Sequence, residues 1–148
     1  MEKIVCGEKS NCDYRRTCYG IVQNNNKYLI AYNEGINEYS LAGGGVENGE
    51  SLEDCIVREF SEEVGYNIIK IREFVNIDCF WIKRDGRKME TDAYFFLVDV
   101  DLTNNFTPTE KGHKALWVEE DFLLGHIEFP YQRKALEIFF DKFHKIWH

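Results

Sequence analysis

The sequence predicts an α+β fold in which strands outnumber helices. Three observations predict it: strand-like segments recur along the chain, one amphipathic helix is expected at about residues 52–64, and a second at about residues 131–147. Of the 148 residues, 44% are hydrophobic and 30% are charged, a composition typical of a globular protein. We therefore expect residues 1–148 to fold as a single domain with a hydrophobic core.

Six segments have the composition of β-strands. They are Arg15–Gln23, Lys27–Asn33, Glu38–Leu41, Ile68–Lys83, Met89–Val100 and Ala115–Val118. Three asparagines join the first two segments, and Asp85 and Gly86 join the fourth to the fifth, so both pairs are predicted to be hairpins. The third segment leads into three consecutive glycines, which are expected to form a flexible loop.

The two helices differ in how clearly the sequence marks their ends. Ser51, with Asp54 three residues later, resembles a helix N-terminus, and Gly65 is a typical stop after Val64. The second helix is expected to begin near Tyr131, because apolar residues follow it at helical spacing. These residues are Leu136, Phe139, Phe140, Phe143 and Trp147.

Charge and hydropathy limit the possible partners. The formal net charge of −8 disfavours a nucleic acid partner, since phosphate backbones bind basic surfaces, but it permits a small anion bound through metal ions. The longest apolar run, Ala93–Val98, is too short to span a membrane, and the N-terminal segment lacks the apolar core of a signal peptide. We therefore expect a cytoplasmic protein with no membrane partner.

The five cysteines do not predict a metal cluster. Cys6, Cys12 and Cys18 are evenly spaced, but the chain has no CxxC pair, which disfavours zinc. Cys55 and Cys79 lie among apolar residues and are expected to be buried thiols.

The helix after the glycines places three carboxylates on one face. At about 100° per residue, Glu63 lies about 40° and Glu62 about −60° from Glu59, beside an apolar stripe. Like charges at this spacing destabilise a helix, by about 0.2–0.5 kcal/mol per pair. One interpretation is a solvated acidic face. The other is a magnesium site, because Mg²⁺ binds a few carboxylates together with substrate phosphates.

The same stretch resembles the Nudix box of the Nudix hydrolase family. Gly44 is followed after five residues by Glu50, and after seven more by "REFSEEVGY", so all seven letter-specific positions of the motif are present. A given window matches these positions by chance on the order of one time in 10⁸. Ala42 replaces the usual proline before the glycines, and Tyr66 replaces an aliphatic residue; both departures leave the charged positions intact.

The resemblance implies an α/β/α sandwich with a mixed sheet, and a reaction. It implies hydrolysis of a nucleoside diphosphate linked to another group, by water attacking phosphorus, with Mg²⁺ as cofactor and Mn²⁺ as a substitute. Glu59, Glu62 and Glu63 would bind metal, Glu59 or Glu62 would act as general base, and the Gly43 carbonyl would be a further ligand. The partner would be a small nucleotide, and the protein a monomer or a homodimer.

The resemblance also assigns supporting roles within the box. Arg58 would orient carboxylates such as Glu50 or Glu59 through its fork of N–H groups. The alternative for Arg58 is a surface salt bridge, and the alternative for the glycines is an ordinary turn.

Some family members supply one more carboxylate from the loop before the last strand. Glu110 is the best-placed candidate here, with Glu119 and Glu120 behind it. His113 in the same loop is expected to be a solvated histidine rather than a base.

The residues outside the box leave the substrate open. Signatures of hydrolases for ADP-ribose, dinucleoside polyphosphates and coenzyme A are missing, so nucleoside triphosphates and unusual sugar nucleotides remain. Four hairpin aromatics would either stack on a base or belong to the core, namely Phe80, Trp81, Tyr94 and Phe96. The alternative to an enzyme is an inactive Nudix-like module that binds a nucleotide or a regulatory partner.

Overall fold

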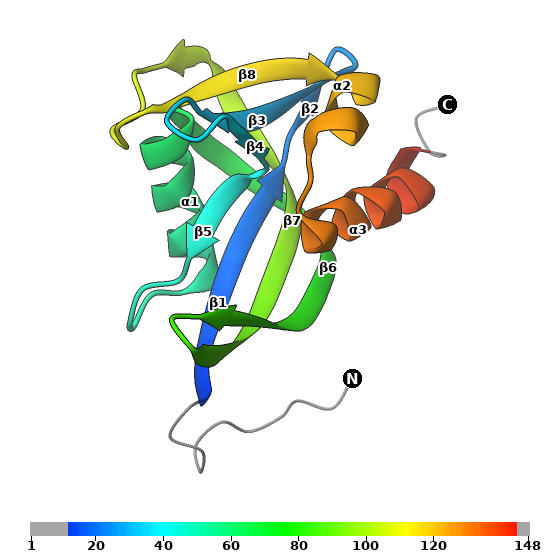
Figure 1. The fold of residues 1–148 in the computed structure, drawn as a ribbon. Helices are drawn as coiled ribbons and strands as arrows, with labels where there is room; N and C mark the ends of the chain where they lie inside the picture. Colours follow the sequence, from blue (N-terminus) through cyan, green and yellow to red (C-terminus); the bar gives the residue numbers. More distant parts are fainter. Residues whose placement is uncertain (1–11, 145–148) are drawn as a thin grey trace.

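The computed structural model describes residues 12–144, in which two β-sheets lie between helices (Figure 1). In sheet A, β1 and β7 run parallel and the other pairs are antiparallel. Its strands, in spatial order, are β5 (Ala42–Gly45), β1 (Cys12–Ile21), β7 (Arg87–Asn105) and β6 (Tyr66–Arg84). Sheet B contains β2 (Gln23–Asn24), β3 (Lys27–Asn33), β4 (Glu38–Ser40) and β8 (His113–Glu119).

The helices flank these strands on two sides. Helix α1 (Leu52–Glu63) lies on one side of the strands, and α3 (Pro130–Phe139) lies on the other (Figure 1). Helix α2 (Glu120–His126) follows β8, and α3 continues into the π-helical turn η1 (Phe140–His144). The predicted α+β fold with a mixed sheet is confirmed. Within residues 12–144, no helix is both long enough and apolar enough to cross a membrane.

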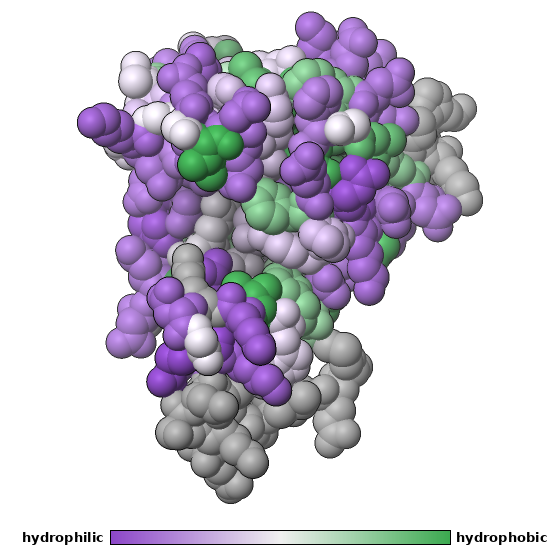
Figure 2. Space-filling model, in the orientation of Figure 1, coloured by the Kyte–Doolittle hydropathy of each residue, from purple (hydrophilic) through white to green (hydrophobic). Residues whose placement is uncertain are grey.

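Sheet A is covered by apolar side chains on both faces. Consecutive residues of β1 point to opposite faces, so Cys18 packs in the cluster that contains Phe60 of α1, and Tyr19 in the cluster that contains Phe139 of α3. Figure 2 shows that hydrophilic residues cover most of the face seen in Figure 1, as expected once the apolar side chains are packed inside. Helices α1 and α3 therefore pack on opposite faces of sheet A.

The ends of α1 are those that the sequence predicts. The Ser51 side chain accepts a hydrogen bond from the Asp54 N–H at 3.0 Å. At the other end, Gly65 has φ +69° and donates its N–H to the Phe60 carbonyl at 2.9 Å. A Cβ at Gly65 would lie 1.9 Å from the Phe106 carbonyl oxygen, so the stop requires glycine for contact as well as for conformation.

The first predicted strand is split in the structure. It ends as β1 at Ile21 and resumes as β2, which belongs to sheet B, so the predicted hairpin is β2–β3 rather than β1–β3. The tight turn itself is confirmed, because Asn25 and Asn26 both have positive φ, at 50° and 64°. The break at Val22 lets one continuous segment join two sheets.

The glycines were expected to be a loop, and this prediction is wrong. They form β5, which pairs antiparallel with β1 in the register Tyr19 to Gly43 and Cys18 to Gly44. A Cβ on Gly43 would lie 2.1 Å from the Cys18 carbonyl oxygen, so the two backbones approach more closely than side chains permit. Glycine is present here because it allows this contact, and composition alone does not distinguish that role from flexibility.

The C-terminal third also differs from the sequence predictions. Helix α2 was not predicted, because its seven residues carry no side-chain cap. The expected helix at about 131–147 is regular only to Phe139, where η1 begins, and Trp147 lies outside the described residues. Of the two cysteines expected to be buried, Cys55 is, whereas Cys79 is half-buried. Among the described strands, β6 lies at the edge of sheet A, next to β7.

Candidate active site

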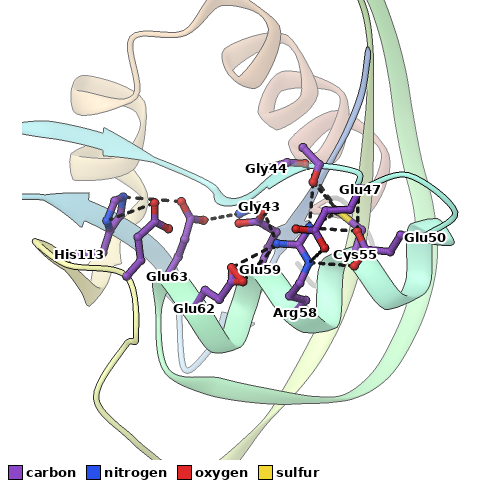
Figure 3. A network of polar contacts seen from close by, with 12 residues as sticks. Gly43, Gly44, Glu47, Glu50, Cys55, Arg58, Glu59, Glu62, Glu63 and His113 are labelled. Atoms are coloured by element: carbon purple, nitrogen blue, oxygen red, sulfur yellow. Dashed lines mark hydrogen bonds and ion pairs between the residues drawn. The ribbon is translucent and has the colours of Figure 1, made fainter.

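The acidic face of α1 lies against the glycine strand β5 (Figure 3). Glu59 and Glu63 are both 9% exposed, whereas the Glu62 side chain is 37% exposed. The Gly43 N–H donates a hydrogen bond to Glu63 Oε1 at 2.7 Å. Helix α1 therefore presents a row of oxygens that is buried where it meets β5 and open to solvent at Glu62.

Arg58 connects the carboxylates at the N-terminal end of this row (Figure 3). Its Nε and Nη2 bind both oxygens of Glu50, at 2.8 and 3.0 Å, in a fork geometry. Its Nη1 lies 3.0 Å from Glu59 Oε1 and 3.2 Å from Glu62 Oε2. Its Nη2 also donates to the Gly45 carbonyl at 2.9 Å, which ties the helix to β5.

The contacts of Arg58 shift the pKa values of the groups that they join. Hydrogen bonding to Arg58 lowers the pKa of Glu50 to about 2, because it favours the ionised carboxylate. The same contact raises the pKa of Arg58 above its ordinary value. The Arg58 side chain is only 23% exposed, so it is a half-buried hub for several carboxylates rather than one exposed ion pair.

Gly44 sets the position of Glu59. A Cβ on Gly44 would lie 2.7 Å from Glu59 Oε1 and 2.8 Å from Oε2, so the carboxylate occupies the space that a side chain would need. Glycine is therefore required at position 44, because a larger residue would collide with the Glu59 carboxylate.

Gly44→Ala is expected to displace the Glu59 carboxylate and to lower activity by about 10-fold or more, with a small effect on folding. The backbone of Gly44 has no positive φ, so the effect arises from contact with Glu59 alone. Steady-state kinetics and thermal unfolding would be compared with Gly125→Ala, where a Cβ would meet nothing within 4 Å. Equal activity of the two variants would contradict this role of Gly44.

A second acidic group lies at the C-terminal end of the row. Glu63, Glu110 and His113 each offer a ligand atom, and these atoms lie within 4.8 Å of one another. His113 Nε2 is 3.8 Å from Glu63 Oε2, and His113 Nδ1 is 4.0 Å from Glu110 Oε1. The Glu110 N–H donates to the Glu62 carbonyl at 2.9 Å, which holds the loop against α1.

The structure separates the candidates proposed for the distal carboxylate. Glu110 is beside the row, whereas Glu119 ends β8 and Glu120 begins α2, about 20 Å along the strand from His113. The expectation that His113 is solvated is wrong, since its side chain is 13% exposed. The contact between His113 and α1 joins residues fifty positions apart in sequence, and only its spacing of three from Glu110 hinted at it.

Burial and crowding make the carboxylates of this group costly to ionise. Burial raises the pKa of Glu63 to about 9, the Gly43 N–H opposes this rise, and the nearby Glu59 and Glu110 charges add to it. Burial also raises the pKa of Glu59. The buried Nδ1 of His113 has no hydrogen-bond partner among the described residues. These converging oxygens fit a hard divalent cation, which prefers oxygen ligands.

Without metal, the protein is expected to lose stability as the pH rises from about 5 to about 9, on the order of a few kcal/mol. The pKa of Glu63 is raised from 4.5 to about 9, so in this window the folded state keeps a proton that the unfolded chain has released. Urea unfolding in a chelator across this range would measure the loss. Glu63→Gln should give a flatter profile, and parallel profiles would contradict this origin.

Comparison with known proteins gives the site a family. Residues 13–137 match the NUDIX domain family. The chain is 31% identical over 128 residues to "Nucleoside triphosphatase NudI" of Escherichia fergusonii, an alignment that covers 80% of this chain and 91% of that protein.

Solved structures show the same fold. A NUDIX hydrolase from Nitrosomonas europaea aligns with a TM-score of 0.74 at 18% identity, covering 87% of this chain and 90% of that one. An ADP-ribose pyrophosphatase from Streptococcus suis aligns with a TM-score of 0.63 at 19% identity, covering 84% and 86%. Together with the complete box on α1, the family match establishes that the chain belongs to the Nudix hydrolase family and is a Nudix pyrophosphohydrolase.

Proposed function

We propose that the protein hydrolyses a nucleoside triphosphate to a nucleoside monophosphate and pyrophosphate, with Mg²⁺ as cofactor. The observation that carries the proposal is the convergence of Glu59, Glu63, Glu110 and His113 beside the glycine strand. The similarity to a relative named as a nucleoside triphosphatase supports the substrate class. The likeness to an ADP-ribose pyrophosphatase, at 19% identity, supports the fold alone.

The metal-binding residues we propose are Glu59, Glu62, Glu63 and Glu110, with the Gly43 carbonyl as a further ligand. Bound Mg²⁺ would neutralise the phosphate oxygens and acidify the attacking water. Mn²⁺ is expected to substitute, because it accepts the same oxygen ligands. In the structure, the Gly43 N–H donates a hydrogen bond to Glu63 and so orients this side chain. Metal binding by the Gly43 carbonyl stays a prediction.

The other steps of the reaction need a general base and a residue that positions the carboxylates. Glu59 or Glu62 takes the proton of the water whose oxygen attacks phosphorus, while the bond to the bridging oxygen breaks and pyrophosphate leaves. Burial raises the pKa of Glu59, which makes its carboxylate a stronger base. Arg58 is a positioning residue, since its fork holds Glu50 and its other bonds orient Glu59 and Glu62.

The test is release of monophosphate and pyrophosphate with Mg²⁺ across nucleoside triphosphates, ADP-ribose, nucleotide sugars and dinucleotides. We expect triphosphates to give the highest kcat/KM and a chelator to abolish turnover. Turnover of a nucleotide sugar alone would keep the pyrophosphohydrolase reaction and reject the triphosphate. Nucleotide binding with Mg²⁺ but no turnover of any substrate would favour the inactive binding module.

A further inference from the structure

The face of sheet A that packs toward α3 carries polar side chains that the proposed catalysis does not use. Arg15, Thr17 and Tyr19 alternate along β1 on this face, and Thr91 and Phe95 of β7 pair with Arg15 and Tyr19. On β6, Asn76 pairs with Phe95 and Phe80 with Thr91, so these side chains share the face. We call Arg15, Thr17, Asn76 and Thr91 the polar patch.

Each member of the polar patch has a buried atom without a hydrogen bond. Arg15 Nε, Thr17 Oγ1, Asn76 Nδ2 and Thr91 Oγ1 have no partner among the described residues. Thr17 is 1% exposed and Thr91 is 2% exposed. Thr17 lies near the Tyr19 hydroxyl without a hydrogen bond of good geometry. Because buried polar groups are almost always paired, four such atoms on one face indicate a missing partner.

The middle of this face is lined by small residues and bounded by aromatic ones. Across the sheet, Gly45, Thr17 and Ala93 are the small members of one row of paired residues. The row ends on β6 at the Asp78 carboxylate, 3.7 Å from Lys134 of α3. On one side of the row, Tyr19 stacks on Phe95 with ring centroids 5.2 Å apart. On the other side, Phe80 stacks on Tyr131 of α3 at 4.6 Å. The Tyr131 ring also lies 5.8 Å from the Tyr19 ring, so it extends across the row, and a planar base that enters here would stack on it or displace it.

Strand β5 connects this face to the proposed phosphate site. Gly43 and Gly45 pair with Tyr19 and Thr17, yet the same strand contacts Glu63 and Arg58 through its backbone. A Cβ on Gly45 would meet nothing within 4 Å, so the space above it is open. A nucleotide whose phosphates lie at Glu63 can therefore extend over β5 toward the polar patch.

We propose that the polar patch binds the nucleobase of the substrate and selects bases that carry ring carbonyls. The proposal rests on the proposed hydrolysis of a nucleoside triphosphate, and it adds which part of the substrate the chain distinguishes. Arg15 Nε and Asn76 Nδ2 are donors only, and the two threonine hydroxyls can also donate. Uracil, thymine, cytosine and guanine present carbonyl oxygens to such a set, whereas adenine offers only ring nitrogens as acceptors.

Binding of nucleoside monophosphates tests the proposal without metal or turnover. UMP, GMP and AMP would be titrated into the metal-free protein by calorimetry. We expect UMP or GMP to bind about 10-fold more tightly than AMP. Thr17→Val and Thr91→Val should each lower that preference by about 3- to 10-fold and leave the binding of inorganic triphosphate in the presence of Mg²⁺ unchanged. Thr103→Val, which removes an exposed hydroxyl on β7, is the control.

Thermal unfolding separates recognition from a structural role. In the free protein, Thr17→Val removes a hydroxyl that has no hydrogen-bond partner within residues 12–144, so the Tm should be unchanged or higher. Equal binding of the three monophosphates, or a Tm loss in both valine variants with no change in base preference, would overturn the proposal. Base-selective binding with no hydrolysis of any nucleotide would reject the proposed hydrolysis but would still support base selection by the polar patch.

Discussion

Glu63→Gln is expected to reduce Mg²⁺-dependent hydrolysis by about 100-fold or more while leaving the fold intact. Residues that merely orient a metal ligand cost about 10- to 100-fold when they are removed, and Glu63 is proposed as a ligand itself. In the native protein the Gly43 nitrogen donates a hydrogen bond to Glu63 Oε1 at 2.7 Å. Glutamine keeps an oxygen that can accept this hydrogen bond, but it carries no charge. Steady-state kinetics with saturating Mg²⁺, beside circular dichroism, would measure both effects.

The matched control is Glu53→Gln, which removes the same charge from the exposed first turn of α1. It should retain activity within a few-fold, because Glu53 is remote from the row of oxygens. Calorimetric titration with Mg²⁺ should show weaker binding for Glu63→Gln alone. Full activity of Glu63→Gln would remove Glu63 from the proposed metal site and would leave Glu59, Glu62 and Glu110 to account for it.

Arg58→Met is expected to destabilise the metal-free protein by about 2 kcal/mol. Removing one partner of a buried ion pair leaves charges without compensation, and the exposure of Arg58, at 23%, makes the cost smaller than for full burial. Activity should also fall by about 10-fold or more, because Glu59 and Glu62 lose the cation that orients them. Urea unfolding in a chelator and initial-rate kinetics would measure the two losses.

Two further variants separate charge from geometry. Arg58→Lys restores the charge but not the fork that holds Glu50, so it should recover only part of the stability. Arg87→Met removes a similar fork to Asp13, with bonds of 2.7 and 2.8 Å, from an exposed position. Its effect on stability should be small. Equal losses for Arg58→Met and Arg87→Met would contradict the special position of Arg58.

The sequence predicted the local parts of the site well, because they depend on short-range rules. Helical periodicity placed Glu59, Glu62 and Glu63 on one face, and the cap at Ser51 and the stop at Gly65 defined the helix. Within the box, Arg58 pairs with Glu50, which lies only eight positions earlier in the sequence.

The remaining features depend on contacts between distant segments. The burial of His113 beside Glu63 requires β8 to pair with β3 in one register, which periodicity does not specify. The three glycines carry no side chains to reveal whether they form a loop or a strand, so β5 appeared only through its pairing with β1. The hydroxyls of Thr17 and Thr91, which have no hydrogen-bond partner in the described part of the chain, likewise cannot be recognised until the packing is known.

The Arg58 hub has a consequence for how this sequence can change over generations. One guanidinium contacts Glu50, Glu59 and Glu62, so the effect of replacing any of these acids depends on whether the arginine is still present. Once Arg58 is lost, the further loss of Glu50 should cost little, and the same holds in the reverse order, although either first step is itself costly. Coupling of this kind favours keeping or losing these charged positions together.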